Sequence, residues 1–411
     1  MGFPSSVRTA SPERVVVAGG GLAGLRTVEE LRARGYAGEV TLVGAETRPP
    51  YDRPPLSKRL MAGELADTTL REDLGALGVT LRLGETATGF EPAAADPAGR
   101  RPGGVLRTDR GEHPYDRLVL ATGAAPVGLP GTGPQRFLRT LDDALALREL
   151  LRAGLRLVIV GAGWIGAELA TAAAARGCQV TVLEAAAAPL TSAVGEQVGA
   201  LTAPWYQAAG VDLRLRQPVG SVEPGGLALA GGGWLDADVA VTAVGVRPET
   251  GWLDGSGVEL DNGVAADEHL RTSVPGVFAV GDCMAFWSLR YGRRLRFEHW
   301  DVALRAPVVL AANLLGGTEV FNPVPYFWSE QFGKMVQYVG FHGAADRVLL
   351  RGDPAADRWA ACWLAGDLLV ALLTVDAPRD LAQGRRLIEA GAAVDAARLA
   401  DPAVPLRETV S

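Results

Sequence analysis

The chain has 411 residues, of which 48% are hydrophobic and 21% charged, and its formal net charge is -7. Because a typical domain has about 100–200 residues, we expect more than one domain. The acidic balance argues against a general nucleic-acid binder, which is usually basic. No apolar run approaches the roughly 20 residues that cross a bilayer, and Met1 to Glu13 lacks the apolar core of a signal peptide, so we expect a cytoplasmic protein with no membrane partner.

Residues that bind metals or form disulfides are few and scattered. The three cysteines, Cys178, Cys283 and Cys362, form no CxxC pair, and the four histidines are equally dispersed. We therefore expect neither a metal site nor a local redox disulfide. Lys58 and Lys334 are the two lysines among 40 basic residues. Genomic composition explains an excess of arginine, and the alternative is that each lysine stands where arginine would not serve.

A glycine motif follows the first strand-like run of the chain. The run Arg14 to Ala18 leads into GGGLAG at 19–24, and helical spacing follows from Leu25 to Arg34. A second strand, Glu39 to Val43, precedes the acid Glu46. Strand, glycine turn, helix, strand and acid are typical of a dinucleotide-binding unit, in which the turn holds a pyrophosphate and the acid accepts ribose hydroxyls.

The same pattern returns further along the chain. The run Leu157 to Val160 leads into GAGWIG at 161–166, and a helix, a strand from Gln179 to Leu183 and the acid Glu184 follow. Two copies in full context predict two bound dinucleotides. Glu184 would repel a 2′-phosphate, and residues 185–188 contain no arginine to bind one, so NADH is favoured over NADPH.

The remaining elements complete an α/β chain. A hairpin at 105–120 turns at Arg110-Gly111, the strand 239–244 ends at Gly245, and the strand-like run 272–282 delivers Asp282 into a turn. From about Phe321 the tail has strand-like runs at 335–339, 358–364 and 368–375 and a helix at 379–390. We predict two Rossmann-like domains, the second inserted in the first, and a small C-terminal α+β domain. The expected domains are 1–120 with 249–320 for the first, 121–248 for the second and 321–411 for the third.

These motifs resemble the FAD-dependent, NADH-utilising ferredoxin reductases of the putidaredoxin reductase and rubredoxin reductase type, which belong to the glutathione-reductase-like flavoproteins. The similarity covers nearly the full length. Its most specific segments are RPPLSK at 53–58 and FWSEQ at 327–331, and ATG at 121–123, GDC at 281–283 and EHW at 298–300 also match. The resemblance implies that the first glycine turn holds FAD and the second holds NADH.

The resemblance also implies roles for individual residues. Lys58 and Glu168 would form a catalytic pair beside flavin N5, where a fixed cation favours the reduced ring. Asp282 would bind the ribityl chain. The residues expected to contact FAD are Gly19, Gly21, Leu22, Ala23, Gly24, Glu46, Arg53, Lys58, Ala87, Ala121, Thr122, Gly123, Asp282 and Trp300. The residues expected to contact NADH are Gly161, Gly163, Trp164, Ile165, Gly166, Glu168, Glu184 and Gly245.

Two positions depart from the family pattern. The family places an acid directly after Gly44, where this chain has Ala45, so either Glu46 takes over the ribose contact or the contact is lost. Trp164 stands where similar proteins often have tyrosine, and it serves either as a movable lid over the flavin or as packing between domains.

The absence of one residue type indicates the electron acceptor. Disulfide reductases and peroxidases of related fold need cysteine at the flavin, and residues 51–60 contain none. Cys283 is expected to be a small core residue. A one-electron carrier is therefore the predicted acceptor, and the resemblance implies that this carrier is a [2Fe-2S] or [3Fe-4S] ferredoxin that feeds a P450 or another oxygenase. The rivals are an NADH oxidase or peroxidase and a redox-gated interaction protein similar to apoptosis-inducing factor, and both a monomer and a homodimer remain open.

A basic run provides a candidate docking face for this acidic carrier. Arg290, Arg293 and Arg294 lie directly upstream of Trp300, and their alternative role is that of a solvated hairpin. By resemblance, Trp328 lies near the flavin on the side that the carrier approaches, and burial in the C-terminal core is the alternative.

Overall fold

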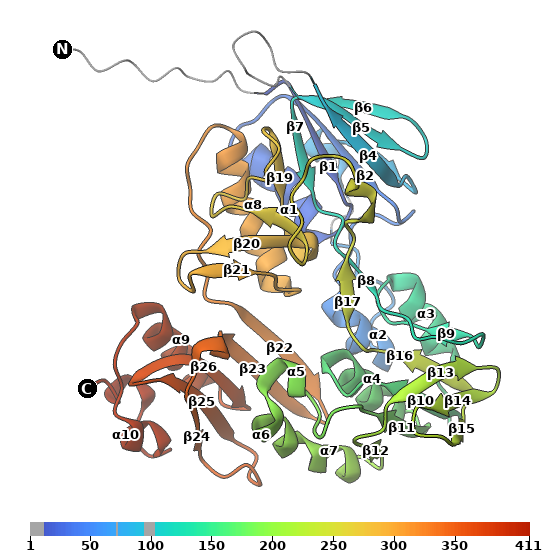
Figure 1. Ribbon diagram of the computed structural model, residues 1–411, viewed down its shortest axis with the longest axis vertical. Coiled ribbons are helices and arrows are strands. Elements are labelled where there is room, and N and C mark those ends of the chain that lie inside the picture. The colour runs from blue at the N-terminus through green and yellow to red at the C-terminus, as the bar shows by residue number, and fades with distance from the viewer. Residues whose placement is uncertain (1–11, 71–72, 94–102) are drawn as a thin grey trace. The chain divides into compact units, whose positions relative to one another are not determined.

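The computed structural model describes residues 12–70, 73–93 and 103–411, so most of the segment Met1 to Glu13 lies outside the described residues. The chain forms two compact units (Figure 1). The first unit contains Met1–Asp52, Thr69–Ala125 and Arg247–Pro323. The second unit contains Arg53–Thr68, Pro126–Val246 and Val324–Ser411.

A five-stranded parallel sheet forms the centre of the first unit. Its strand order is β19-β7-β1-β2-β3. The apolar run in β1 is fully buried from Val15 to Ala18, as expected for a central strand of a sheet that is covered on both faces. The elements of this layer are β1 (Arg14–Ala18), α1 (Leu22–Ala33), β2 (Glu39–Gly44), β3 (Thr80–Leu83), β7 (Arg117–Leu120), β19 (Val277–Ala279) and α8 (Trp300–Leu314).

Two smaller sheets complete the first unit. The antiparallel sheet β4-β5-β6 confirms the predicted hairpin, which turns at residues 109–111 between β5 and β6. The other small sheet has the order β18-β20-β21. These strands are β4 (Ala87–Pro92), β5 (Gly104–Thr108), β6 (Glu112–Tyr115), β18 (Val264–Ala266), β20 (Met284–Ser288) and β21 (Arg293–Leu295).

A second parallel sheet, with the order β12-β11-β10-β16-β9, lies in the second unit. Helix α3 (Leu141–Leu150) begins with a capping box, in which the Thr140 hydroxyl accepts from the Asp143 amide and the Asp143 carboxylate accepts from the Thr140 amide. The strands are β9 (Gln135–Arg136), β10 (Arg156–Val160), β11 (Gln179–Leu183), β12 (Asp212–Arg214) and β16 (Val239–Thr242). The helices are α2 (Arg59–Ala62), α4 (Trp164–Ala175), α5 (Thr191–Val194), α6 (Glu196–Gly199) and α7 (Ala203–Ala208).

The same unit contains two further antiparallel sheets. The three-stranded sheet consists of β13 (Val219–Glu223), β14 (Gly226–Leu229) and β15 (Trp234–Asp236). The C-terminal sheet has the order β22-β23-β26-β25-β24, which confirms all three predicted strand-like runs of the tail. Its elements are β22 (Tyr326–Gln331), β23 (Lys334–Gly340), β24 (Arg347–Arg351), β25 (Trp359–Ala365), β26 (Leu368–Val375), α9 (Pro378–Ala390) and α10 (Ala396–Ala400). Strands β8 (Ala124–Pro126) and β17 (Val246–Pro248) lie where the chain passes from one unit to the other.

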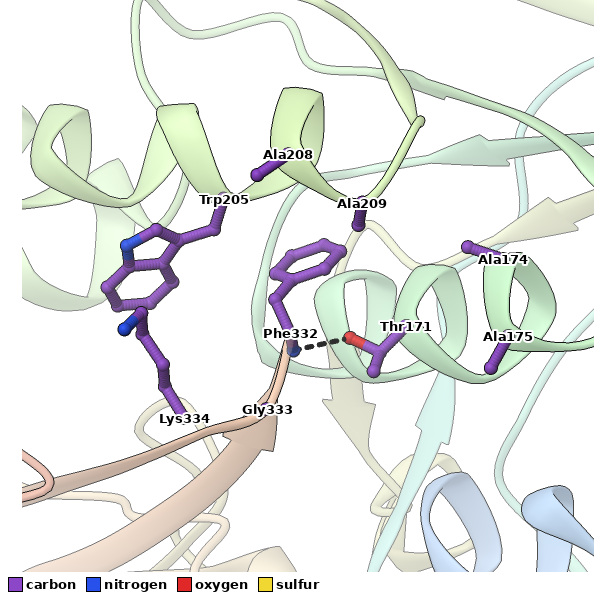
Figure 2. Close-up of a pocket in the computed structure, with 9 residues that line it drawn as sticks. All are labelled: Thr171, Ala174, Ala175, Trp205, Ala208, Ala209, Phe332, Gly333 and Lys334. Atoms are coloured by element: carbon purple, nitrogen blue, oxygen red, sulfur yellow. Dashed lines mark hydrogen bonds between the residues drawn. The ribbon is translucent and has the colours of Figure 1, made fainter. Parts of the chain in front are cut away.

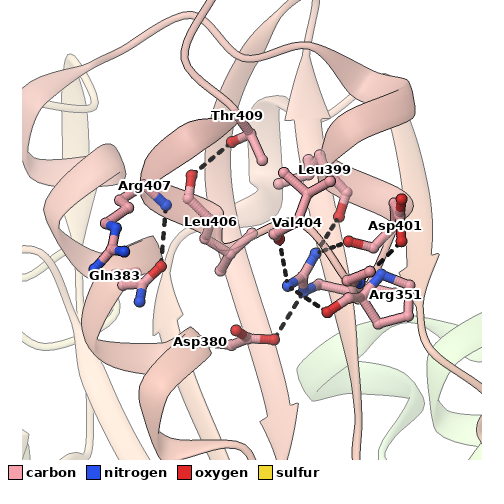
Figure 3. Close-up of polar contacts among 11 residues, drawn as sticks. Arg351, Asp380, Gln383, Leu399, Asp401, Val404, Leu406, Arg407 and Thr409 are labelled. Atoms are coloured by element: carbon pink, nitrogen blue, oxygen red, sulfur yellow. Dashed lines mark hydrogen bonds and ion pairs between the residues drawn. The ribbon is translucent and has the colours of Figure 1, made fainter.

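A buried arginine holds the end of the chain against the C-terminal sheet (Figure 3). The Arg351 guanidinium, 3% exposed, pairs with Asp380 of α9 at 2.8 Å. It also donates to the backbone carbonyls of Leu399, Asp401 and Val404 at 3.1, 2.5 and 2.8 Å. Because a planar fork of donors reaches several carbonyls at once, a single side chain orders the segment after α10.

The predicted fold class is confirmed, with two parallel sheets of the nucleotide-binding type and a C-terminal antiparallel domain. None of the helices within the described residues combines the length and the apolar character that spanning a membrane requires. The same residues contain no cluster of three or more potential metal ligands of the His, Cys, Asp or Glu type.

Candidate functional site

The first glycine turn connects β1 to α1 by close backbone contacts. Gly19 has φ +132°, and a Cβ added there would lie 2.0 Å from the carbonyl oxygen of Ala121. A Cβ at Gly24 would lie 1.9 Å from the carbonyl oxygen of Gly19. Any larger residue at either position would therefore push the helix or the neighbouring strand end away.

The middle glycine of this turn faces open space. A Cβ added at Gly21 meets nothing within 4 Å, and no side chain caps the first amides of α1. Unpaired amides at a helix start carry partial positive charge and bind phosphate. The turn, which also contains Leu22 and Ala23, therefore fits a dinucleotide pyrophosphate.

Other predicted residues gather at the carboxyl edge of the same sheet. Ala121, Thr122 and Gly123 directly follow β7. Gly281 lies so close to α1 that an added Cβ would be 3.0 Å from the Ala23 side chain, and this contact brings Asp282 to the start of α1. The carboxyl edge of a parallel sheet is where ligands of such folds bind.

The helix α8 begins at this edge with a histidine and a tryptophan. Trp300, its first residue, donates its indole N–H to Asp52 at 2.7 Å. Burial lowers the pKa of the preceding His299 to about 4, and the negative charge of Asp282 opposes this effect. His299 is therefore neutral at pH 7. Sequence reasoning quoted this histidine only within the EHW motif and gave it no role.

The remaining residues predicted for the first nucleotide have less direct support. Glu46 accepts a hydrogen bond from the Tyr51 hydroxyl at 2.6 Å and is partly buried, whereas Ala45 is exposed. Ala87 lies in β4, where it pairs with Thr108. The ribose contact of Glu46 and the flavin contact of Ala87 both stay predictions.

The second glycine turn repeats the geometry of the first between β10 and α4. A Cβ at Gly161 would lie 2.4 Å from the carbonyl oxygen of Ala243, and one at Gly166 would lie 2.0 Å from that of Gly161. A Cβ at Gly163 again meets nothing within 4 Å, and α4 has no side-chain cap. This turn therefore also fits a pyrophosphate. Gly245, at φ +113°, follows the neighbouring strand β16.

Glu184 stands at the carboxyl end of β11, beside this turn. One carboxylate oxygen accepts from the Ala162 amide and the other from the Ala186 amide, both at 2.8 Å. These bonds fix the carboxylate in the position from which a ribose is bound in such folds. Ile165, also predicted to contact NADH, is 42% exposed at the start of α4.

The predicted pair of Lys58 and Glu168 is present inside the second unit. The Lys58 ammonium lies 2.8 Å from Glu168 Oε2, with side chains 10% and 3% exposed. Ser57 donates to the same oxygen, and Ser329 of β22 donates to Glu168 Oε1 at 2.6 Å. Glu168 thus holds three donors from two distant segments. Sequence reasoning quoted Ser57 and Ser329 within their motifs but did not connect them to Glu168.

Arg53 also belongs to the second unit. Its guanidinium donates to the carbonyl oxygen of Arg139 at 2.8 Å. This bond ties the RPPLSK segment to the residues just before α3, so the position of Arg53 is fixed by the backbone it contacts.

Trp164 packs against the C-terminal domain. Its ring meets that of Phe327 edge-on, with centroids 4.4 Å apart and an interplanar angle of 66°. It joins a cluster that includes Val336 and Tyr338 of the C-terminal sheet. This contact supports the packing role that the sequence left open for Trp164.

The cysteine after Asp282 is a core residue, as predicted. Cys283 is buried, and its Sγ lies 3.4 and 3.5 Å from the carbonyl oxygens of Val280 and Leu120. Burial raises the pKa of this thiol, which keeps it protonated and a poor nucleophile.

The basic hairpin offers two exposed arginines. Arg290 and Arg293 are exposed, whereas Arg294 donates to the carbonyl oxygens of Ala266 and Ala285 at 2.8 and 3.2 Å. Arg294 also pairs with Asp261 at 3.3 Å. Arg290 and Arg293 are thus the more exposed charges of this hairpin.

Trp328 lies at the side of the C-terminal sheet rather than in its core. Its ring stacks on that of Tyr326, with centroids 6.1 Å apart and planes at 18°, and it remains partly exposed. Neither of two buried clusters of this domain, one around Val336 and Trp359 and one around Val339 and Leu372, includes Trp328. The alternative of core burial is therefore disfavoured.

Comparison with known proteins covers nearly the whole chain. Residues 13–306 match the family model of pyridine nucleotide-disulphide oxidoreductases, and residues 326–410 match a reductase C-terminal model. The ferredoxin–NAD(+) reductase component of the anthranilate 1,2-dioxygenase system from Burkholderia cepacia is 36% identical over 97% of this chain and 99% of its own. Putidaredoxin reductase from Pseudomonas putida is 33% identical over 97% of each chain.

Solved structures agree with these similarities. The crystal structure of Fdr9 matches with a TM-score of 0.90 and 49% identity, covering 96% of this chain and 99% of that one. The covalent complex of putidaredoxin reductase with putidaredoxin also matches with a TM-score of 0.90, at 33% identity, covering 97% of this chain and 98% of that one.

Proposed function

We propose that this chain, which belongs to the pyridine nucleotide-disulphide oxidoreductase family, passes electrons from NADH to a ferredoxin-type iron–sulfur protein. FAD would be its bound cofactor. When bound, FAD supplies the exchange between a hydride, which carries two electrons, and the single electrons that an iron–sulfur centre accepts. The carrier in turn would supply a P450 or another oxygenase.

The observation that carries this proposal is the pair of glycine turns, each at an uncapped helix start on a parallel sheet. Gly21 and Gly163 leave the approach to the helix amides open. These amides would bind the two pyrophosphates. Glu184 would accept the ribose hydroxyls of NADH, and its charge would repel the 2′-phosphate of NADPH.

The buried pair of Lys58 and Glu168 would stabilise negative charge on the flavin ring. Glu168 fixes the ammonium at 2.8 Å, and Ser57 and Ser329 fix the carboxylate. A cation that is held in place stabilises negative charge as it develops on a neighbouring ring, with little reorganisation during the reaction. Hydride transfer itself depends on positioning, so no other acid, base or nucleophile is required.

The proposed acceptor rests on the relatives and on the cysteines. The relatives above are named as reductases of ferredoxins or putidaredoxin, and one is solved in complex with its carrier. Residues 51–60 contain no cysteine, and Cys283 is buried with a raised pKa. A thiol that would accept an electron pair is therefore absent from the positions where related enzymes use one.

Anaerobic rapid mixing with NADH, followed by addition of [2Fe-2S] or [3Fe-4S] ferredoxins, tests the function. We expect rapid bleaching of the flavin and reduction of at least one carrier. Fast turnover of oxygen or peroxide without a carrier would indicate the oxidase or peroxidase instead. Slow turnover with an NADH-driven change in oligomeric state would indicate an interaction protein similar to apoptosis-inducing factor.

The docking face is tested with charge reversals at Arg290 and Arg293. Both variants are expected to slow ferredoxin reduction and to flatten its salt dependence, with ferricyanide reduction unchanged. Arg407→Glu, at an exposed arginine whose side chain is 70% accessible, is the matched control in the C-terminal domain. Equal loss with ferredoxin and ferricyanide would contradict a docking role.

A further inference from the structure

The second unit contains a hollow that the proposed function does not use (Figure 2). It lies where α4, α7 and the turn between β22 and β23 come together, and its volume is about 420 Å³. Sites for small molecules typically have about 300–1,000 Å³. The hollow is thus large enough for a molecule of two fused rings.

The walls of this hollow are mostly apolar. Alanine methyl groups of α4 and α7, among them Ala174 and Ala208, line it together with the rings of Trp205 and Phe332. Small side chains on facing helices leave the space open, and the two aromatic rings offer flat apolar surface. Planar aromatic molecules are the guests that such surfaces bind best.

One cation stands at the wall of the hollow. The Lys334 side chain extends from the hairpin toward Trp205, and its ammonium lies 5.8 Å from the centroid of that ring. Its acidic partner, Asp357, is 3.6 Å away with a side chain that is 98% exposed. Such an exposed ion pair contributes little to stability, so another carboxylate can displace Asp357 at little cost.

The turn between β22 and β23 is held in place by contacts of Phe332. Phe332 and Gly333 have φ +52° and +74°, as the two central residues of a two-residue hairpin turn require. The Phe332 amide donates to the Thr171 hydroxyl at 2.9 Å, and the Phe332 ring packs on that of Tyr206 with centroids 4.5 Å apart. These two contacts fix the Phe332 ring at the wall of the hollow.

The charges around the hollow determine the kind of guest. Among the lining residues that the structure describes, Lys334 is the charged one, and none carries an acid. A guest with one negative charge and an aromatic body therefore matches both the cation and the walls. Lys334 is also one of only two lysines in the chain, and the predicted function uses the other.

We propose that this hollow is a binding site for a small aromatic monocarboxylic acid. The aromatic body packs against Trp205 and Phe332, and the carboxylate pairs with the Lys334 ammonium. The proposal does not depend on the identity of the electron acceptor, because the hollow is described entirely by contacts within the second unit.

Because the chain has two lysines, isotope labelling gives a direct test. Full-length protein is prepared with lysine carrying ¹³C at Cε, and 2-naphthoate is added to millimolar concentration. We expect the Lys334 signal to shift saturably, whereas the Lys58 signal stays in place and serves as the internal control. No saturable shift of Lys334, or a shift confined to Lys58, would overturn the proposal.

Analogues and variants then separate the two parts of the recognition. 2-Naphthylmethanol, which lacks the charge, and octanoate, which lacks the rings, are expected to bind at least about tenfold more weakly than 2-naphthoate. Lys334→Met should weaken naphthoate binding by a similar factor, measured by calorimetry. Ala208→Leu, at an exposed position, should weaken it by filling the hollow without changing charge. Affinity that is unchanged in both variants, or equal for all three probes, would refute the site.

Discussion

Replacement of Glu168 by glutamine is the most direct test of the buried ion pair. The Glu168 carboxylate is 3% exposed and accepts hydrogen bonds from Ser57, Lys58 and Ser329. Glutamine has nearly the same shape, but its NH₂ group can only donate, and its neutral amide leaves the Lys58 ammonium without a counter-charge. The side chain of Lys58 is 10% exposed, so water compensates little of this loss.

The expected magnitude follows from this burial. Removal of one partner of a buried pair costs about 3–5 kcal/mol. Lys58 keeps a weaker bond to the carbonyl oxygen of Pro54 at 3.3 Å, which favours the lower end of that range. For a unit of this size, each kcal/mol lowers the Tm by about 2–4 °C, so we expect a Tm about 6–12 °C lower.

Thermal and urea unfolding, followed by circular dichroism, measure this effect. The matched control is Glu64→Gln, which removes the Arg59–Glu64 pair, whose side chains are each 61% exposed. That control should cost less than about 1 kcal/mol. The double variant Lys58→Met with Glu168→Gln should lose less than the sum of the single losses, because no unpaired charge remains. A Glu168→Gln loss as small as the control, or an additive double variant, would refute the reasoning.

Three other residues give predictions of their own. Glu184→Ala should raise the KM for NADH by about tenfold and reduce the preference for NADH over NADPH, measured as the ratio of kcat/KM for the two cofactors. Arg351→Met removes the donor to the Leu399, Asp401 and Val404 carbonyl oxygens and the partner of Asp380, and should destabilise the protein by about 3 kcal/mol in urea unfolding, with Arg407→Met nearly neutral. The pKa of His299 is about 4 when folded, below the unfolded value of 6.5, so the unfolded state binds the extra proton between these values. Stability is thus lost as pH falls from 6.5 to 4, and His299→Asn should reduce that loss by up to about 3 kcal/mol.

Local sequence patterns predicted much of the fold. The run Arg14 to Ala18, its glycine turn and the following helix lie within about 20 residues, and the requirements of each element are met by neighbours in the chain. The strand-like runs of the C-terminal tail likewise became β23, β25 and β26 nearly to the residue. Where periodicity and turn chemistry agree, the local sequence is enough to predict the element. It does not predict which strands lie beside that element in the sheet.

Local sequence patterns could not predict contacts between distant segments. The pairing of Lys58 with Glu168 was expected only from resemblance, and the bond from Ser329 was not expected at all. Ser329 lies 161 residues after Glu168, and the register of β22 decides whether its hydroxyl faces the carboxylate. A shift of one residue would turn it to the opposite face of the sheet.

The position of Ser329 also gives the C-terminal domain a role beyond packing. Ser329, in strand β22 of that domain, donates to one oxygen of Glu168 and orients it. The other oxygen accepts from Ser57 and Lys58. The same domain contacts the start of α4 through the rings of Phe327 and Trp164. Helix α4 therefore meets strand β22 both at its first residue and one turn later. Because both contacts lie within one compact unit, any shift of β22 along α4 would disturb the Lys58 ammonium and the second glycine turn together.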